Sequence, residues 1–346
     1  MANIALLLPC AATDFRGNTT TANRLARGLE GKGHECKIFS LGEKPASETD
    51  LLIGLHSGRT GHLAQAIGKA RNIPYIVLCT GTDLNGKPEE ATCHAVRTAD
   101  ARVCLAAAPA KRGRELFGKD CHFEVIPQAP MALPRKSGLK VPDGILSDPK
   151  LPLVLVPAGI RAVKNPRRIV EALIPLEQEG VAFQLLFVGP ELEKEEGKRL
   201  RQLLEPLGWA SWPGAMDRQT LAVLMEQCLC VLSASKSEGG APNALLEAGM
   251  ASRPILASSI GVHKEFPGEP WVFSGDPMLR SRLRQWIEEP IVAAREGRSL
   301  REFTRRYSDP RREAAEWDRV IRAVFAPPKA SPYRSTPWPG KGSSQA

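Results

Sequence analysis

The sequence predicts an α/β protein made of two Rossmann-like units that follow one another along the chain. Short apolar runs rich in Leu, Val and Ile alternate with segments of helical periodicity over most of the 346 residues. The rhythm stops at a stretch rich in Pro, Gly and charge, residues 131–150, and then begins again. The apolar runs lack alternating polar positions, which is typical of parallel strands covered by helices on both faces.

Each unit contains several strand-like runs separated by helical segments. In the first unit we expect strands at residues 3–9, 35–41, 50–56, 73–81, 102–107 and 122–128, and helices at 18–34 and 62–72. In the second unit we expect strands at residues 151–159, 183–190, 229–235 and 253–259, and helices at 165–180, 195–208, 219–228 and 241–252. Two facing units of this kind bind ligands between them, at the carboxyl ends of their strands.

The breaks in composition give the domain boundaries. We expect a first domain over residues 1–132, a linker over 133–150 and a second domain over 151–305. A helix over residues 306–326 would return to the first domain. The composition of residues 327–346, which are rich in Pro, Ser and Gly, is that of a disordered tail.

The net charge of +9 and the pI of about 9.2 favour anionic ligands. No dense run of Lys and Arg interleaved with aromatic residues occurs, so a nucleic-acid partner is not predicted. The Arg-rich segment 280–322 would suit a peripheral contact with a membrane. Its many acidic residues make a solvated helix face the better interpretation.

The cysteine pattern and the hydropathy indicate where the protein works. Eight cysteines occur without a CxxC pair, which predicts free thiols, no metal site and a cytoplasmic location. The first apolar run lacks a basic leader and reads as a strand. No apolar segment is long enough to cross a bilayer, so we expect no transmembrane segment.

The stretch "SEGGAPNALLEAG" points to a phosphate and sugar site. Gly239 and Gly240 follow a strand and allow the backbone to approach a ligand closely. The helix that begins near Pro242 offers free amides and the positive end of its dipole to a phosphate. Glu247 would accept hydrogen bonds from ribose hydroxyls, and Glu238 from a sugar beyond the phosphates. The alternative is a plain structural turn with two glutamates.

Two further loops follow strands. "GIRAVKNP" places Arg161 and Lys164 close together, and two cations at a strand end suit a diphosphate. In "FRGNTTTANR", Gly17 and Asn18 open a loop whose Thr residues would cap the next helix. The loop lacks the GxGxxG pattern, so no nicotinamide cofactor is predicted.

Taken in order, the motifs resemble those of a known enzyme family. "RGNTTTANRLARGLEGKGHE", "DLLIGLH", "GTDL", "GIRAVKNP", "LLFVGPE", "SEGGAPNALLEAG" and "PILASSIGVHKE" are similar to GT-B glycosyltransferases of the large family four, also called group 1. Within that family the sequence is most similar to the selenosugar synthases and to the group called glycosyltransferase 1 domain-containing protein 1. The resemblance covers about residues 3 to 270.

The resemblance implies a role for each motif. Lys164 and Arg161 would neutralise the diphosphate of a nucleotide-sugar donor. Glu247 would bind the ribose and Glu238 the transferred sugar. Gly17 and Asn18 would approach the diphosphate from the first domain. Gly189 would lie near the base. Family members of this kind usually retain the anomeric configuration and use no metal, and no Asp-x-Asp motif occurs here.

The sequence departs from the family pattern in the two glutamates, the two cations and a histidine. Glu238 and Glu247 are separated by one residue more than is usual, and Arg161 and Lys164 lie closer together. Thr80 stands where the family often has His before "GTD". We therefore expect Thr80, Asp83 and Arg59 on the acceptor side. His56 is the candidate catalytic histidine there, or else a strand-end residue bonded to the backbone.

The sequence thus predicts a metal-independent, retaining glycosyltransferase that uses a nucleotide-sugar, a UDP-sugar by resemblance, without a cofactor. Lys164, Arg161, Glu238 and His56 are its candidate catalytic residues. One alternative is a selenosugar synthase that joins a UDP-sugar to selenophosphate, with Arg16, Arg24 and Arg59 as cations for the acceptor. Another is a non-catalytic protein that binds nucleotide-sugars. The acceptor is not identified.

Overall fold

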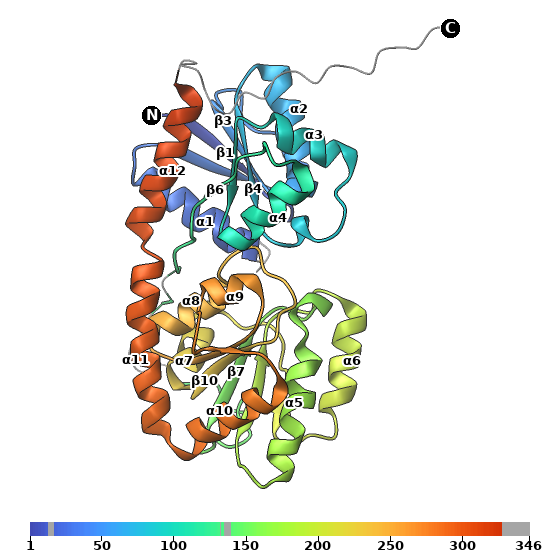
Figure 1. The fold of residues 1–346 in the computed structure, drawn as a ribbon, viewed down its shortest axis with the longest axis vertical. Helices are drawn as coiled ribbons and strands as arrows, with labels where there is room; N and C mark the ends of the chain where they lie inside the picture. The colour runs from blue at the N-terminus through green and yellow to red at the C-terminus, as the bar shows by residue number, and fades with distance from the viewer. Residues whose placement is uncertain (13–16, 132, 135–139, 327–346) are drawn as a thin grey trace, which may run out of the picture.

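The computed structural model describes residues 1–12, 17–131, 133–134 and 140–326. Two six-stranded parallel sheets lie one beyond the other, each flanked by helices (Figure 1). This confirms the predicted α/β fold with two Rossmann-like units. The predicted tail, residues 327–346, lies outside the described residues, as does part of the predicted linker.

The first sheet has the strand order β2-β1-β3-β4-β5-β6. Its strands are β1 (Asn3–Leu7), β2 (Glu35–Phe39), β3 (Leu51–Leu55), β4 (Tyr75–Cys79), β5 (Ala101–Cys104) and β6 (Glu124–Val125). Its helices are α1 (Gly17–Glu30), α2 (His62–Arg71), α3 (Glu90–Thr98) and α4 (Ala107–Phe117). The six expected strands are all present. Helices α3 and α4 were not predicted; they bury mostly small residues, such as Ala95 and Ala110.

The second sheet has the strand order β12-β11-β10-β7-β8-β9. Its strands are β7 (Leu153–Pro157), β8 (Gln184–Val188), β9 (Ala210–Ser211), β10 (Cys230–Ser233), β11 (Ile255–Ser258) and β12 (Val272–Phe273). Its helices are α5 (Pro166–Gln178), α6 (Lys194–Leu204), α7 (Arg218–Gln227), α8 (Asn243–Met250), α9 (Gly261–Glu265) and α10 (Asp276–Glu288). The predicted strands and helices are present. The elements β9, β12 and α9 are too short to leave a periodic pattern in the sequence.

Two carboxyl-terminal helices run along one side of both domains (Figure 1). The first, α11 (Pro290–Tyr307), packs on α8 of the second domain, and the second, α12 (Pro310–Phe325), packs on α1 of the first. Trp317, Val320 and Ile321 of α12 are buried in the core of the first domain. The chain therefore ties its two domains together twice, through the linker and through these helices.

Several charges of the Arg-rich segment 280–322 form ion pairs. Arg282 contacts Glu296, and Arg322 contacts Asp318 on the same helix at 2.8 Å. Pairing of this kind is typical of a solvated helix face. Among the described residues, no helix combines the length and the apolar character needed to cross a bilayer.

The strand order fixes where a ligand can bind. In each sheet the first strand has a later strand on each side, so the strand order reverses at that strand. The neighbours of β1 are β2 and β3, and those of β7 are β8 and β10. Open α/β sheets bind ligands outside the carboxyl ends of such strands. The loops after β1 and β3 therefore face those after β7 and β10, which lie in the other domain.

Candidate functional site

A cleft of about 580 Å³ lies between the two domains at the carboxyl ends of both sheets. Its walls come from the loops after β1, β3 and β4 in the first domain and after β7, β8 and β10 in the second. All the predicted site residues except Asp83 line it: Gly17, Asn18, His56, Arg59, Thr80, Arg161, Lys164, Gly189, Glu238, Gly239, Gly240 and Glu247.

Lys164 and Glu238 form the centre of the second-domain wall. Lys164 follows β7 and Glu238 follows β10, which pair in the sheet, so the loops after them meet. Lys164 Nζ lies 2.5 Å from Glu238 Oε1, and both side chains are largely buried. Burial raises the pKa of Glu238, but Lys164 and a hydrogen bond with Ser235 outweigh it, so the pKa lies below its ordinary value. Glu238 is therefore a carboxylate.

A short turn places Lys164 and Arg161 in the cleft. Residues Ala162–Lys164 form one turn of 3₁₀ helix, and Glu193 accepts a hydrogen bond from the amide of Ala162 at 2.8 Å. Asn165 has a left-handed backbone (φ 52°), and Pro166 then starts α5. Arg161 Nε is buried and has no hydrogen-bond partner among the described residues. A buried, unpaired guanidinium nitrogen is suited to an anionic ligand.

Glu247 lies deep in the second-domain wall, in the second turn of α8. It is 4% exposed, and its Oε1 accepts a hydrogen bond from Arg218 Nη2 at 2.9 Å. Burial raises the pKa of Glu247, and the charges of Arg218 and Arg24 offset the rise only in part. Arg218 was not among the residues predicted from the sequence. Asp217 caps α7 through the amides of Gln219 and Thr220, and as a typical N-cap residue it is a signal that could have placed Arg218 at the start of this helix.

Gly239 and Gly240 allow a close approach between the two domains, which was not predicted from the sequence. A Cβ atom on Gly239 would lie 2.2 Å from the backbone nitrogen of Gly81, and one on Gly240 would lie 2.4 Å from Cβ of Leu105. Leu105 and Gly240 also form an isolated parallel bridge. Both glycines line the cleft, but their missing side chains make room for the first domain, so here the two domains touch backbone to backbone.

Gly189 lies at the end of β8 and has a similar role within the second domain. A Cβ atom there would lie 2.2 Å from the carbonyl oxygen of Ala158. The carbonyl of Gly189 accepts a hydrogen bond from the indole of Trp212 at 2.9 Å, which fixes this corner of the cleft. Met216, which also lines the cleft, lies on the same side.

Gly17 and Asn18 form the first turn of α1, which corrects the prediction that they open a loop. The threonines that were expected to cap the helix are part of it. Thr19 and Thr21 are 8% and 4% exposed, because they pack inside the domain. Gly17 and Asn18 still line the cleft, and nothing lies within 4 Å of the position of a Cβ atom on Gly17.

His56 and Arg59 belong to the first-domain wall. His56 ends β3 with a left-handed backbone (φ 93°), which is costly for a residue with a side chain. Its Nδ1 is buried and has no partner among the described residues. Burial lowers the pKa of His56 by more than the charge of Asp83 raises it. The imidazole is therefore neutral near neutral pH. Thr80 lines the cleft beside it.

Asp83 was expected to orient a ligand, but its carboxylate is occupied by backbone amides. It accepts hydrogen bonds from Ser57 N and Gly81 N, both at 2.8 Å, and from Thr80 N at 3.3 Å. These bonds join the loops after β3 and β4. Asp83 therefore shapes the first-domain wall from behind and does not face the cleft.

The cations that were considered for an anionic acceptor have different positions. Arg24 is 8% exposed and paired with Glu313 of α12, so it is not free to bind an acceptor. Arg59 lines the cleft. Arg16 lies outside the described residues.

Comparisons with known proteins agree with this geometry. Residues 141–269 match the family model of glycosyl transferases group 1. Glycosyltransferase 1 domain-containing protein 1 of Xenopus tropicalis is 25% identical over 276 residues, which is 74% of this chain and 78% of that protein.

Two solved structures of low sequence identity share the fold of nearly the whole chain. Sucrose-phosphate synthase from Thermosynechococcus elongatus has a TM-score of 0.72 at 15% identity and covers 94% of this chain and 99% of its own. Anabaena HepE, in a complex with UDP and glucose, has a TM-score of 0.73 at 14% identity and covers 93% of this chain and 100% of its own. The match of residues 141–269 to the group 1 model, the similarity to the Xenopus protein and the two-domain GT-B fold together support a group 1 glycosyltransferase.

Proposed function

We propose that the donor is a UDP-sugar, bound by the second-domain wall of the cleft. The observation that carries the proposal is the meeting of Lys164, Arg161 and Glu238 at the carboxyl ends of β7 and β10, with Glu247 on α8 beside them. Fold neighbours in complexes with UDP and with UDP-glucose support the choice of nucleotide.

The diphosphate occupies the cationic part of this wall. Lys164 supplies a point charge, and Arg161 supplies a guanidinium whose Nε is unpaired among the described residues. The amino end of α8 adds free backbone amides. Glu247 accepts hydrogen bonds from the ribose, with Arg218 holding its carboxylate in place. Glu238 binds the hydroxyls of the sugar, and the base lies near Gly189 and Met216.

Catalysis comes from stabilising the leaving group. As the bond between the anomeric carbon and the diphosphate oxygen breaks, that oxygen gains negative charge, and Lys164 and Arg161 neutralise it within the cleft. Protein cations thus do the work that a divalent metal does in other transferases. We propose a metal-independent reaction with retention at the anomeric carbon, as in the family that the sequence resembles.

The acceptor binds against the first-domain wall. His56 presents a neutral imidazole with an unpaired, buried Nδ1, which suits a hydrogen bond to a sugar hydroxyl or to the acceptor. Among the described residues of the first-domain wall that line the cleft, Arg59 carries the positive charge. It favours an acceptor that carries an anionic group, so a selenophosphate acceptor remains the second candidate.

A screen of donors and acceptors tests the proposal. The purified protein is incubated with UDP-sugars and with phosphate, selenophosphate or simple sugars, and the products are identified by mass spectrometry. We expect release of UDP from at least one UDP-sugar and a new glycoside with one acceptor class. If only donors built on other nucleotides release their sugar, the assignment of UDP is wrong.

We also propose a reducing compartment such as the cytoplasm, because all eight cysteines are unpaired and six of them are buried. A titration of thiols in denaturant without reductant should find all eight. Paired cysteines in protein isolated from its natural source would contradict this location.

A further inference from the structure

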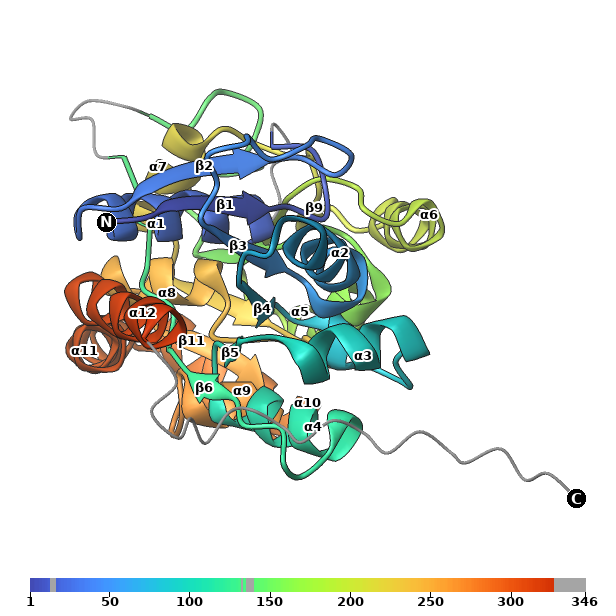
Figure 2. The same cartoon turned by 90° about the horizontal axis from the view of Figure 1, so that it is seen from above.

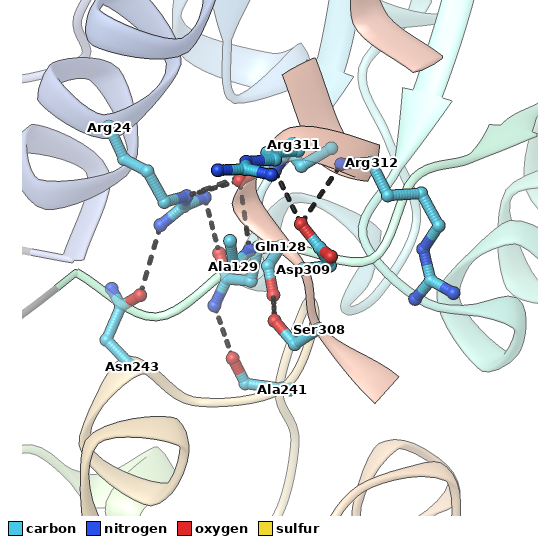
Figure 3. A network of polar contacts seen from close by, with 10 residues as sticks. Arg24, Gln128, Ala129, Ala241, Asn243, Ser308, Asp309, Arg311 and Arg312 are labelled. Carbon is cyan, nitrogen blue, oxygen red and sulfur yellow. Dashed lines mark hydrogen bonds and ion pairs between the residues drawn. The ribbon is translucent and has the colours of Figure 1, made fainter. Parts of the chain in front are cut away.

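Arg24 lies at the junction of four parts of the molecule (Figure 3). Its Nε donates to both carboxylate oxygens of Glu313 on α12, at 3.1 and 3.0 Å. Its Nη2 donates to Oε1 of Gln128, just before the linker, at 3.1 Å. Its Nη1 donates to Oδ1 of Asn243, the first residue of α8, at 3.2 Å. One guanidinium of α1 therefore reaches α12, the segment just before the linker and the donor-side helix α8.

A second layer of hydrogen bonds closes the network. The side-chain amide of Gln128 donates to the carbonyl of Ala241, two residues before Asn243. The carbonyl of Gln128 accepts a hydrogen bond from Ser308 Oγ at 2.5 Å, and Glu313 Oε2 accepts one from the amide of Ala129 at 3.0 Å. The turn from Ala241 to Asn243 is thus held at one end by Gln128, which Arg24 contacts, and at the other end by Arg24 itself.

The position of this turn matters for the donor site. It connects Gly240, which touches Leu105 of the first domain, to α8, which carries Glu247. Gln128 and Asn243 also line the cleft. A shift of the turn would move the amino end of α8 and Glu247 together, because a helix moves as a rigid unit.

Electrostatics explains why α12 takes part. Arg24 brings a cation close to the positive end of the α8 dipole, which is unfavourable without compensation. Glu313 supplies the compensating charge, and both side chains of the pair are more than nine-tenths buried. The contact of Arg24 with Asn243 therefore depends on a carboxylate from the carboxyl-terminal helix, beyond both sheets in the sequence.

We propose that Arg24 is a positioning residue, which clamps the turn Ala241–Asn243 so that α8 presents its amino end and Glu247 to the donor. The proposal rests on the donor site described above. Through Glu313, it makes helix α12 a working part of that site as well as a cover for the first-domain core.

The test replaces Arg24 by lysine, which keeps the charge opposite Glu313 but has one nitrogen in place of the guanidinium fork. We expect Arg24→Lys to weaken the binding of UDP about tenfold, because the contacts with Asn243 and Gln128 are lost. The melting temperature should fall as well, because buried acceptors on Gln128 and Asn243 lose their donor, so UDP affinity is compared at a temperature where both proteins are folded. Arg319→Lys is the matched control, since Arg319 also bridges two carboxylates, Glu124 and Glu316, but at an exposed position on α12. It should bind UDP as the wild type does.

A double-mutant cycle with Asn243→Ala distinguishes positioning from a general loss of stability. If Arg24 acts through Asn243, the double variant Arg24→Lys/Asn243→Ala should bind UDP about as weakly as the weaker single variant. Full additivity of the two effects, or unchanged UDP affinity in Arg24→Lys, would overturn the proposal. A wild-type protein that fails to bind UDP would instead refute the donor site itself.

Discussion

The two walls of the cleft differ in how their charges are arranged. The second-domain wall carries several charged side chains, of which Lys164 is paired with Glu238 and Arg218 with Glu247, while Arg161 Nε has no partner among the described residues. Among the described lining residues of the first domain, Arg59 is the one with a charged side chain, and the imidazole of His56 is neutral. Figure 2 shows the same molecule from above, with the first domain nearest the viewer.

This difference matches the two ligands of the proposed reaction, because the diphosphate and ribose of the donor are constant whereas acceptors differ. A nucleotide-sugar presents the same diphosphate and ribose in every reaction. If the side chains of the wall are in position before the donor binds, the free energy of reorganisation during the reaction is small. An acceptor is met by a wall with few charges, whose shape is set from behind by backbone bonds such as those to Asp83. The predictions below test this division of labour.

The largest effect is expected at Lys164. Lys164→Ala should lower kcat by at least about a hundredfold, because it removes one proposed stabiliser of the leaving diphosphate from the cleft. It also leaves Glu238 buried without its partner. Lys236→Ala is the control, since Lys236 is exposed and lies on the neighbouring loop. Near-normal turnover in Lys164→Ala would show that the diphosphate lies elsewhere.

The two glutamates should separate donor recognition into two steps. Glu247→Ala should weaken UDP binding by about 1.5 to 3 kcal/mol, the usual cost of losing a hydrogen bond to a charged group. Glu238→Ala should leave the affinity for UDP unchanged and weaken the binding and turnover of the whole UDP-sugar. Calorimetric titration with UDP and with UDP-glucose measures both. Equal UDP affinity in the wild type and Glu247→Ala would contradict the ribose assignment.

Gly239→Ala should force the domains apart at their backbone contact. The new Cβ would lie 2.2 Å from the nitrogen of Gly81, and overpacking of this kind costs about 1 to 3 kcal/mol. We expect kcat/KM to fall while the fold is kept, as circular dichroism can verify. Gly208→Ala is the control, because nothing lies within 4 Å of its added Cβ. An unaffected kcat/KM in Gly239→Ala would mean that the contact of Gly239 with Gly81 is not needed.

The opposite pKa shifts of the two glutamates predict a pH dependence. As the pH falls, Glu247 takes up a proton first, because its pKa is above the ordinary 4.5, whereas the pKa of Glu238 is below it. The affinity for UDP-glucose should therefore decline while the pH is still above 4.5, as Glu247 loses its charge. The stability that the Lys164–Glu238 pair adds should persist until lower pH. In Glu247→Gln the early decline should be absent; its persistence would assign the titration to another group.

The smallest effect concerns metals. Because Lys164 and Arg161 are positioned to carry the charge of the diphosphate, EDTA should leave the initial rate unchanged within error. The measurement compares rates with and without added magnesium or manganese. An absolute requirement for either ion would show that these two cations are insufficient.

How far the sequence reaches can be argued from particular residues. The strands were predictable because buried parallel strands are continuous apolar runs, as in "LPLVLVP" and "DLLIGLH". That Lys164 and Glu238 share a site followed from their places after strands. Their direct contact depends on β7 and β10 being neighbours in the sheet. Strand order cannot be predicted from the sequence of either strand alone.

The features that could not be predicted depend on contacts between segments that are far apart in the sequence. The partner of Arg24 lies 289 residues away on α12, and no local pattern of charge marks that pair. Gly239 and Gly240 looked like ligand-binding glycines, because a close approach to a ligand and a close approach to another backbone demand the same missing side chain. Arg218 was missed because its partner is set by how α7 and α8 pack.

The most direct measurement compares the affinity for UDP in variants of the two walls. One set alters the second domain, with Lys164→Ala and Glu247→Ala, and the other alters the first, with Arg59→Ala and His56→Asn. The account predicts that the second-domain variants lose at least about tenfold in UDP affinity. The first-domain variants should bind UDP as the wild type does, with only transfer to the acceptor impaired. Equal losses of UDP affinity in both sets, or losses in the first-domain set alone, would contradict it.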